Sequence, residues 1–399
     1  MLLLQVLLYS GRFLVIIEAM EKLVKIIKKE PMLIVSVLAA AISLVITPPD
    51  KSLFSKIDWH TLGTLFMMLT VLEGFKQENL FNPLIKVSIR FKTMATLSLF
   101  LIFGVFFSSM FVTNDVSLII FVPLTIQIFR GVGREECILP VISMENIAAI
   151  RGSLLMPFGS PQNLFLYQQS GYSIGHFMLH MLPLSVGSAV LLIIFVLIMY
   201  RKDFHSSVNC SVDKLIKEWK KEDQKKRLTY LFLFVVILAT IVSRTNYWFI
   251  SVLTVIILIT LVNRKLFKSV DYVLLVTFLC FFIFSSSIAA NPSIRTILEK
   301  AVAGNEYWWS IGLSQIISNV PASIVLYPFT KNFAGLIYGA DTAGLCSLIG
   351  SLASVINYRI YVREYPDKGM KFIRTFTLIS WAFFIIVVIP GYLLTKWHF

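Results

Sequence analysis

The sequence carries one short polar pattern twice, each time inside an apolar stretch, and the two copies lie about half the chain apart. The first copy begins at Thr113–Asp115 and the second at Ser318–Pro321. The same offset of 205 positions relates a hydroxyl residue, an Asn, an Ile, a Pro and a Thr. A polar interruption of a membrane helix frees backbone groups, which can hold a solute or an ion where they line a cavity. Two such halves predict a secondary transporter.

Composition places the chain in a membrane. Of its 399 residues 57% are hydrophobic and 15% are charged, whereas a soluble domain has about 25% charged residues. The net charge of +14 does not indicate nucleic-acid binding, because the charges lie in the connections between apolar runs, where they set topology. The four cysteines form no C-x-x-C pair, so they predict neither a disulfide framework nor a zinc site. The sequence holds no Walker loop, no H-E-x-x-H and no catalytic constellation, so we do not expect an enzyme.

Apolar runs predict an all-α polytopic fold. Runs long enough to cross a bilayer, roughly 17–25 residues with some shorter or tilted, occur at 32–47, 60–75, 139–167, 177–200, 228–243, 247–262, 271–290, 339–358 and 375–395. The two copies of the polar pattern lie in 93–129 and 307–330, which we interpret as re-entrant helical hairpins. We therefore expect about nine or ten transmembrane helices, two hairpins and broken helices.

Basic residues predict how the chain crosses the membrane. If the linker 201–227 is cytoplasmic, the loops on its side hold 27 of the 36 Lys and Arg residues, and the opposite loops hold 7. This asymmetry supports the assignment and makes 31–200 and 228–399 inverted repeats. Residues 1–30 are an interfacial amphipathic helix or an extra span, and the sequence leaves both open. A prokaryotic plasma membrane fits this pattern.

The two hairpin tips are the first candidate binding sites. Asp115 needs protein, water or a cation beside it, because an unpaired carboxylate in hydrocarbon costs at least ~2.5–3.5 kcal/mol. Together with Thr113 and Asn114 it suits Na⁺ or a proton, although Asn and Asp also cap helices. At the second tip, Ser318 and Asn319 precede a half-helix whose positive end could attract an anion, or they form a simple capped turn.

A broken helix is predicted after the first hairpin, and a counterpart stretch rich in small and hydroxyl residues follows the second. The first break, at 151–163, carries two prolines and five candidate binding residues, namely Arg151, Gly159, Ser160, Gln162 and Asn163. The charge of Arg151 persists in the membrane, so it meets an anionic substrate or pairs structurally with Glu145. The counterpart at 344–357 lacks proline and offers Gly350, Ser351 and Ser354, which could equally serve helix packing. Asp341, just before it, is expected at the membrane interface.

With these residues in view, the chain resembles the ion transporter superfamily. The resemblance is to the citrate-transporter-like permeases, a group with the arsenite permeases, sodium–proton antiporters and divalent-anion sodium symporters. It rests on the two tips and on Pro157–Asn163, which is similar to the family's Gly-x-Pro-x-Asn break. It implies inverted repeats, a central site between the hairpins, Na⁺ or H⁺ coupling, and a homodimer. Asp115 and Val320 depart from the Ser-Asn-Thr tips of the dicarboxylate branch.

These observations predict a permease for a small inorganic or carboxylate anion, such as citrate or a dicarboxylate. Arg151 and the half-helix ends would meet the anion, and Asn114 with Asp115 would serve Na⁺. No cofactor beyond the coupling ion is expected, and the partners are the anion and the lipid bilayer, not nucleic acid. Two alternatives stay open: an arsenite or antimonite efflux permease, and a Na⁺/H⁺ antiporter.

Overall fold

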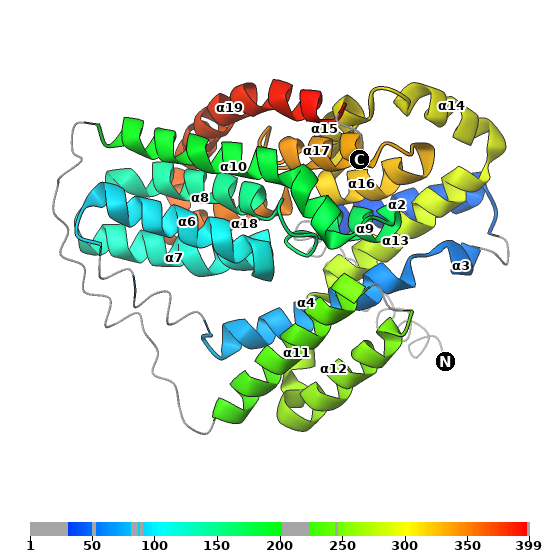
Figure 1. Ribbon diagram of the computed structural model, residues 1–399, viewed down its shortest axis with the longest axis horizontal. Coiled ribbons are helices and arrows are strands. Elements are labelled where there is room, and N and C mark those ends of the chain that lie inside the picture. The colour runs from blue at the N-terminus through cyan, green and yellow to red at the C-terminus, as the bar shows by residue number, and fades with distance from the viewer. Residues whose placement is uncertain are drawn as a thin grey trace, which may run out of the picture.

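The computed structural model describes residues 31–49, 53–80, 87, 91–201, 223–243 and 246–396. Within these residues the chain is helical and has no β-strand (Figure 1). The predicted N-terminal segment 1–30 and most of the linker 201–227 lie outside the described residues.

The two halves of the sequence contribute similar series of helices. The first half consists of α2 (Pro31–Ile46), α3 (Leu53–Lys56), α4 (Trp59–Gln77), α6 (Met94–Val112), α7 (Asn114–Gly131), α8 (Ile138–Gly152), α9 (Pro161–Ser170) and α10 (Ile174–Met199). The second consists of α11 (Gln224–Ser243), α12 (Trp248–Asn263), α13 (Tyr272–Ala290), α14 (Pro292–Val302), α15 (Glu306–Ile317), α16 (Asn319–Leu326), α17 (Phe333–Ala343), α18 (Leu352–Glu364) and α19 (Gly369–Leu394). Short 3₁₀ turns lie at Glu135–Cys137, Arg264–Ser269, Tyr327–Phe329 and Pro366–Lys368.

Matching helices in the two halves begin with the same local chemistry. Asp58 accepts a hydrogen bond from the Thr61 amide at 2.9 Å and starts α4, and Asp271 accepts one from the Leu274 amide at 3.0 Å and starts α13. Both helices have 19 residues. An N-cap carboxylate satisfies one of the free amides at a helix start and favours its positive end. The repeat therefore extends beyond the hairpin tips that revealed it.

The helices form two packed groups. We call α2, α4, α11, α12 and α13 the framework group, because they pack on one another, and α6–α10 with α15–α19 the hairpin group. In Figure 1 α4, α11 and α12 lie below the hairpin group, and α13 runs from them up to its right-hand side. Within the hairpin group the halves exchange elements: α9 packs on α16 and α17, and α18 packs on α7 and α8. The interior of the hairpin group is thus built from both halves.

Length and composition identify an all-helical membrane protein, as predicted. Among the described residues, six helical segments are long and apolar enough to span a bilayer: Met94–Val112, Ile174–Met199, Gln224–Ser243, Trp248–Ser269, Tyr272–Ala290 and Pro366–Leu394. Leu33–Ile46 is a shorter apolar helix. The first of the six is α6, so one arm of the first hairpin is long enough to cross. The inverted orientation of the two halves stays a prediction.

Each half contains a broken helix, and the second break corrects the expectation of a continuous apolar span over 339–358. The first break, between α8 and α9, falls where the prolines predict it. The second interrupts the run 339–358 between α17 and α18, although no proline stands there. Side chains take the place of proline: Gln315 donates to the Ala343 carbonyl at 3.2 Å and accepts from Ser347 at 2.7 Å, and Ser347 accepts from the Gly350 amide at 3.2 Å. These bonds hold backbone groups that a continuous helix would satisfy itself.

Candidate functional site

The two hairpin tips share one strained backbone conformation. Thr113 has φ 72° and ψ 154°, and Ser318 has φ 69° and ψ 160°. Residues other than glycine rarely occupy this region, and each costs of order 1–3 kcal/mol unless the surroundings enforce it. Neither side chain caps the helix that follows, so the simple capped-turn interpretation does not describe these tips. Strain of this kind at two matching positions marks them as candidates for function.

Each tip is docked on the broken helix of its own half. The Asn114 amide donates to the Gly159 carbonyl, and the Asn319 amide donates to the Gly350 carbonyl, both at 3.2 Å. A Cβ at Gly159 would lie 2.5 Å from the Ser153 carbonyl oxygen, and one at Gly350 would lie 2.3 Å from that of Ala343. Only glycine fits at either position. The structure therefore places four predicted site residues in two equivalent contacts.

Arg151 lies at the end of α8 and is fully buried. All three of its guanidinium nitrogens are buried and lack a hydrogen-bond partner among the described residues. A buried cation without partners costs several kcal/mol, so its surroundings must offer a compensating charge. The carboxylate whose charge acts on Arg151 is Asp341 of α17, in the other half of the chain.

Asp341 is a candidate functional residue whose location the sequence analysis predicted wrongly. It is fully buried and is not at the interface that its position before the second break suggested. Gln162 of α9 donates to Asp341 Oδ1 at 3.0 Å, while Asp341 Oδ2 is buried without a partner. Asn163 approaches the same carboxylate and donates to the Ser153 carbonyl at 3.3 Å. Asn319 donates to the carbonyl of Ala340, the neighbouring residue, at 3.4 Å.

The alternative in which Arg151 pairs structurally with Glu145 was wrong. Glu145 is buried on α8, but its Oε1 accepts a hydrogen bond from Thr125 of α7. Residues six positions apart are rotated by about 240° around the helix axis, so Glu145 and Arg151 point to different sides of α8. Glu145 thus ties α8 to the first hairpin and leaves the guanidinium of Arg151 to Asp341.

The remaining predicted residues lie around the two breaks and the first tip, and only some of them contact one another. Ser354 of α18 accepts a hydrogen bond from Asn146 of α8 at 3.0 Å, which joins the two halves. Ser160 and Ser351 are buried at equivalent positions, directly before α9 and α18, and the Ser160 hydroxyl has no partner. No described hydrogen bond joins the first tip's Asp115 to the Arg151–Asp341 pair.

The first tip has donors that fit a hard monovalent cation. Asp115 Oδ1 is buried and has no hydrogen-bond partner among the residues that the structure describes, and Asp271 at the start of α13 adds negative charge to its surroundings. The Asn114 side-chain oxygen already accepts from the Asp115 amide at 2.9 Å, so it could bind a cation only through its remaining lone pair. Among the described residues, no group of three or more His, Cys, Asp or Glu side chains could hold a metal ion.

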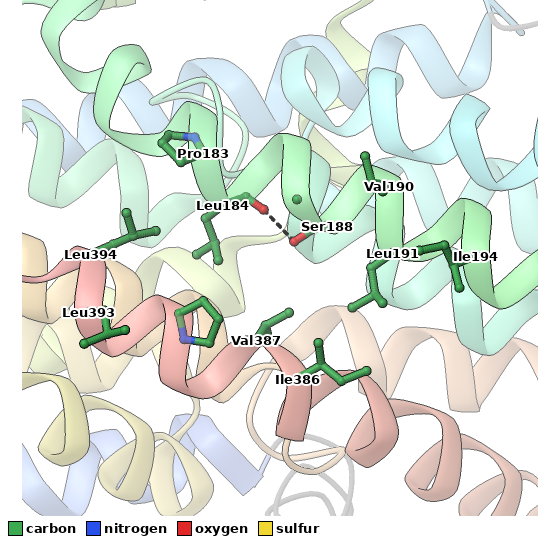
Figure 2. Close-up of a pocket in the computed structure, with 12 residues that line it drawn as sticks. Pro183, Leu184, Ser188, Val190, Leu191, Ile194, Ile386, Val387, Leu393 and Leu394 are labelled. Atoms are coloured by element: carbon green, nitrogen blue, oxygen red, sulfur yellow. Dashed lines mark hydrogen bonds between the residues drawn. The ribbon is translucent and has the colours of Figure 1, made fainter.

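A cavity of about 610 Å³ between α10 and α19 is a poor candidate for an anion. Figure 2 shows its lining, which is apolar apart from the hydroxyl of Ser188, and that hydroxyl donates to the Leu184 carbonyl at 2.6 Å. None of the lining residues is a predicted site residue. A buried polar cluster lies elsewhere and consists of Arg151, Asp341, Gln162 and Asn163, which we call the central cluster.

The fold and this cluster define an integral membrane transporter: apolar spanning helices, paired broken helices, and a buried charged centre built from both halves. Comparison with known proteins gives the family. The citrate transporter family model matches residues 13–338, and the chain belongs to that family.

Two relatives are similar to this chain over most of their length. The inner membrane protein YbiR of Escherichia coli K12 is 31% identical over 322 residues, which are 78% of this chain and 82% of the relative. The uncharacterized transporter MJ0456 of Methanocaldococcus jannaschii is 29% identical over 349 residues, which are 86% of this chain and 92% of the relative.

Proposed function

We propose that the protein is a secondary active transporter that moves a small anion, such as citrate or a dicarboxylate, by alternating access with Na⁺ or H⁺ coupling. The observation that carries the proposal is Arg151, a fully buried guanidinium with three unpartnered nitrogens at the meeting point of the two halves. A planar guanidinium with its donors free matches a carboxylate in geometry and charge. The match to the citrate transporter family supports a carboxylate as the substrate.

In this proposal the anion binds to Arg151 and to the start of α16, whose first amides lie at the second tip. The coupling cation binds at the first tip, where Asp115 Oδ1 is free. The two tips flank the central cluster through their contacts with Gly159 and Gly350. The homodimer and the prokaryotic plasma membrane, with the linker 201–227 in the cytoplasm, remain our predictions.

Uptake by the full-length protein in proteoliposomes tests the proposal. Citrate, succinate and arsenite are each offered with and without an inward Na⁺ or H⁺ gradient. We expect gradient-driven uptake of citrate or succinate. Arsenite flux without carboxylate flux would move the protein to the metalloid alternative. Na⁺/H⁺ exchange without solute flux would favour the antiporter alternative and leave Arg151 without a substrate.

A further inference from the structure

We propose that Asp341 is a proton-exchanging counter-ion: it balances Arg151 in the empty site and is protonated when a substrate anion takes its place. The inference rests on the proposed function and adds to it, because the coupling cation was assigned to Asp115 and not to this carboxylate. It stands on the geometry of the central cluster, which joins α8, α9 and α17.

The first step concerns the empty site. Asp341 is the acidic group whose charge acts on Arg151, and both side chains are fully buried. Yet the two make no ion pair within hydrogen-bond distance, since neither the guanidinium nitrogens nor Asp341 Oδ2 have a hydrogen-bond partner in the described part of the chain. The pair therefore offsets charge without saturating its hydrogen-bonding groups, and the five free donors of the guanidinium stay available to an incoming carboxylate.

The second step concerns what an anion does to Asp341. A carboxylate bound to Arg151 is a second negative charge in a buried space with one cation. Two carboxylates that share one buried site do not both stay ionised, because the cost of the uncompensated charge exceeds that of taking up a proton. Substrate anion and Asp341 therefore compete for Arg151, and the weaker competitor binds a proton. On release of the substrate, Asp341 gives the proton back to water and returns to the guanidinium.

The surroundings of Asp341 leave few other groups to take that role. The titratable or charged side chains acting on the pair in the described part of the chain are Tyr307, Tyr338 and Cys346. The neighbouring helix α9 contributes the uncharged amides Gln162 and Asn163, and α16 has no charged residue. Helix α15, which also packs on α17, begins with the buried Glu306, whose carboxylate accepts hydrogen bonds from Thr330 and Asn332. The stretch 375–394 of α19, which packs on α17, also has none. Gln162 holds Asp341 Oδ1 at 3.0 Å in place, so a proton would go to Oδ2.

Glu145 provides a matched control. It is another fully buried carboxylate, on the same helix as Arg151, but its Oε1 is bonded to Thr125 and its charge does not act on Arg151. Glu145→Gln keeps the acceptor oxygen that Thr125 uses. Asp341→Asn likewise keeps the acceptor for Gln162. Both substitutions replace a fully buried carboxyl group with an amide, and only Asp341→Asn acts on the group in the proposed exchange.

The test measures protons and substrate together in proteoliposomes of the wild type and both variants, with labelled citrate outside and a pH-sensitive dye inside. We expect Asp341→Asn to keep citrate exchange at zero gradient, to lose the accumulation that a proton gradient drives, and to move one proton fewer per citrate. Glu145→Gln should behave as wild type. An unchanged proton ratio in Asp341→Asn, or a wild type that moves no protons, would overturn the inference.

A second measurement needs no substrate, so failure of the proposed function does not leave the inference untested. Infrared difference spectra report protonated carboxyl groups directly. In Arg151→Gln, Asp341 loses its neighbouring cation, and we expect the band of a protonated carboxyl group. The band should disappear in the double variant Arg151→Gln/Asp341→Asn. It should persist in the double variant Arg151→Gln/Glu145→Gln. A band unaffected by Asp341→Asn would show that Arg151 does not control this carboxylate.

Discussion

The two hairpins have the same tip and different arms, and the contrast separates what the fold needs from what the chemistry needs. The first hairpin has arms of 19 and 18 residues, and the second has arms of 12 and 8. Both tips nevertheless share a strained backbone and an Asn amide bonded to a glycine carbonyl at 3.2 Å. The charged residues do not follow this symmetry: Asp115 and Arg151 belong to the first half and Asp341 to the second. A symmetric frame thus holds an asymmetric site.

The docking glycines give the largest expected effect. Gly159→Ala and Gly350→Ala should each destabilise the protein by about 1–3 kcal/mol and abolish most transport, because the new methyl group overlaps a backbone oxygen. Gly312→Ala in α15 is the control, since a Cβ there meets nothing within 4 Å. Thermal melting in detergent and uptake assays measure both effects. If one glycine tolerates alanine and the other does not, the tips are not equivalent.

We expect the second break to depend on Gln315, whereas the first break does not depend on the residue at the matching position of the first half. Gln315→Leu removes the bonds to Ala343 and Ser347 and should cost about 1–3 kcal/mol. The position 205 residues earlier is Met110, so Met110→Leu is the matched control, and we expect a cost below about 1.5 kcal/mol. Equal melting temperatures for the two variants would contradict the view that side chains replace proline in the second half.

The strain at the tips predicts a gain in stability. Thr113→Gly and Ser318→Gly should each raise the free energy of unfolding, by about 1 kcal/mol, because glycine adopts this conformation freely. Ser318→Ala removes the hydroxyl but keeps the strain, so it separates the two contributions. A lower melting temperature in both glycine variants would mean that the hydroxyl groups, and not the backbone, hold the tips.

A surface pair between the halves should contribute least. Arg130 of α7 lies 3.2 Å from Glu364 of α18, and both side chains are exposed, at 40% and 45%. Exposed pairs of this kind contribute up to about 1 kcal/mol. Glu364→Gln should therefore shift the melting temperature only slightly, and less as salt is added. A large shift would show that the exchange of α18 between halves relies on its surface and not on its buried contacts.

Local patterns in the sequence predicted the parts of the site that local chemistry creates. The repeated Asn114 and Asn319 located both tips, and the prolines near Gly159 located the first break. Long-range contacts escaped, because nothing in the sequence around Asp341 shows that Arg151 lies beside it. The second break escaped for the same reason, since its stabilising residue, Gln315, lies on another helix.

The central claim is that Arg151 binds the substrate anion, and equilibrium binding of labelled citrate to purified protein in detergent tests it most directly. We predict that Arg151→Gln weakens binding at least about 100-fold, as expected for loss of a buried charged partner. Arg151→Lys should retain part of the affinity through its charge, and Glu145→Gln should bind as wild type. Wild-type affinity in Arg151→Gln would contradict the claim and leave Arg151 as a structural partner of Asp341.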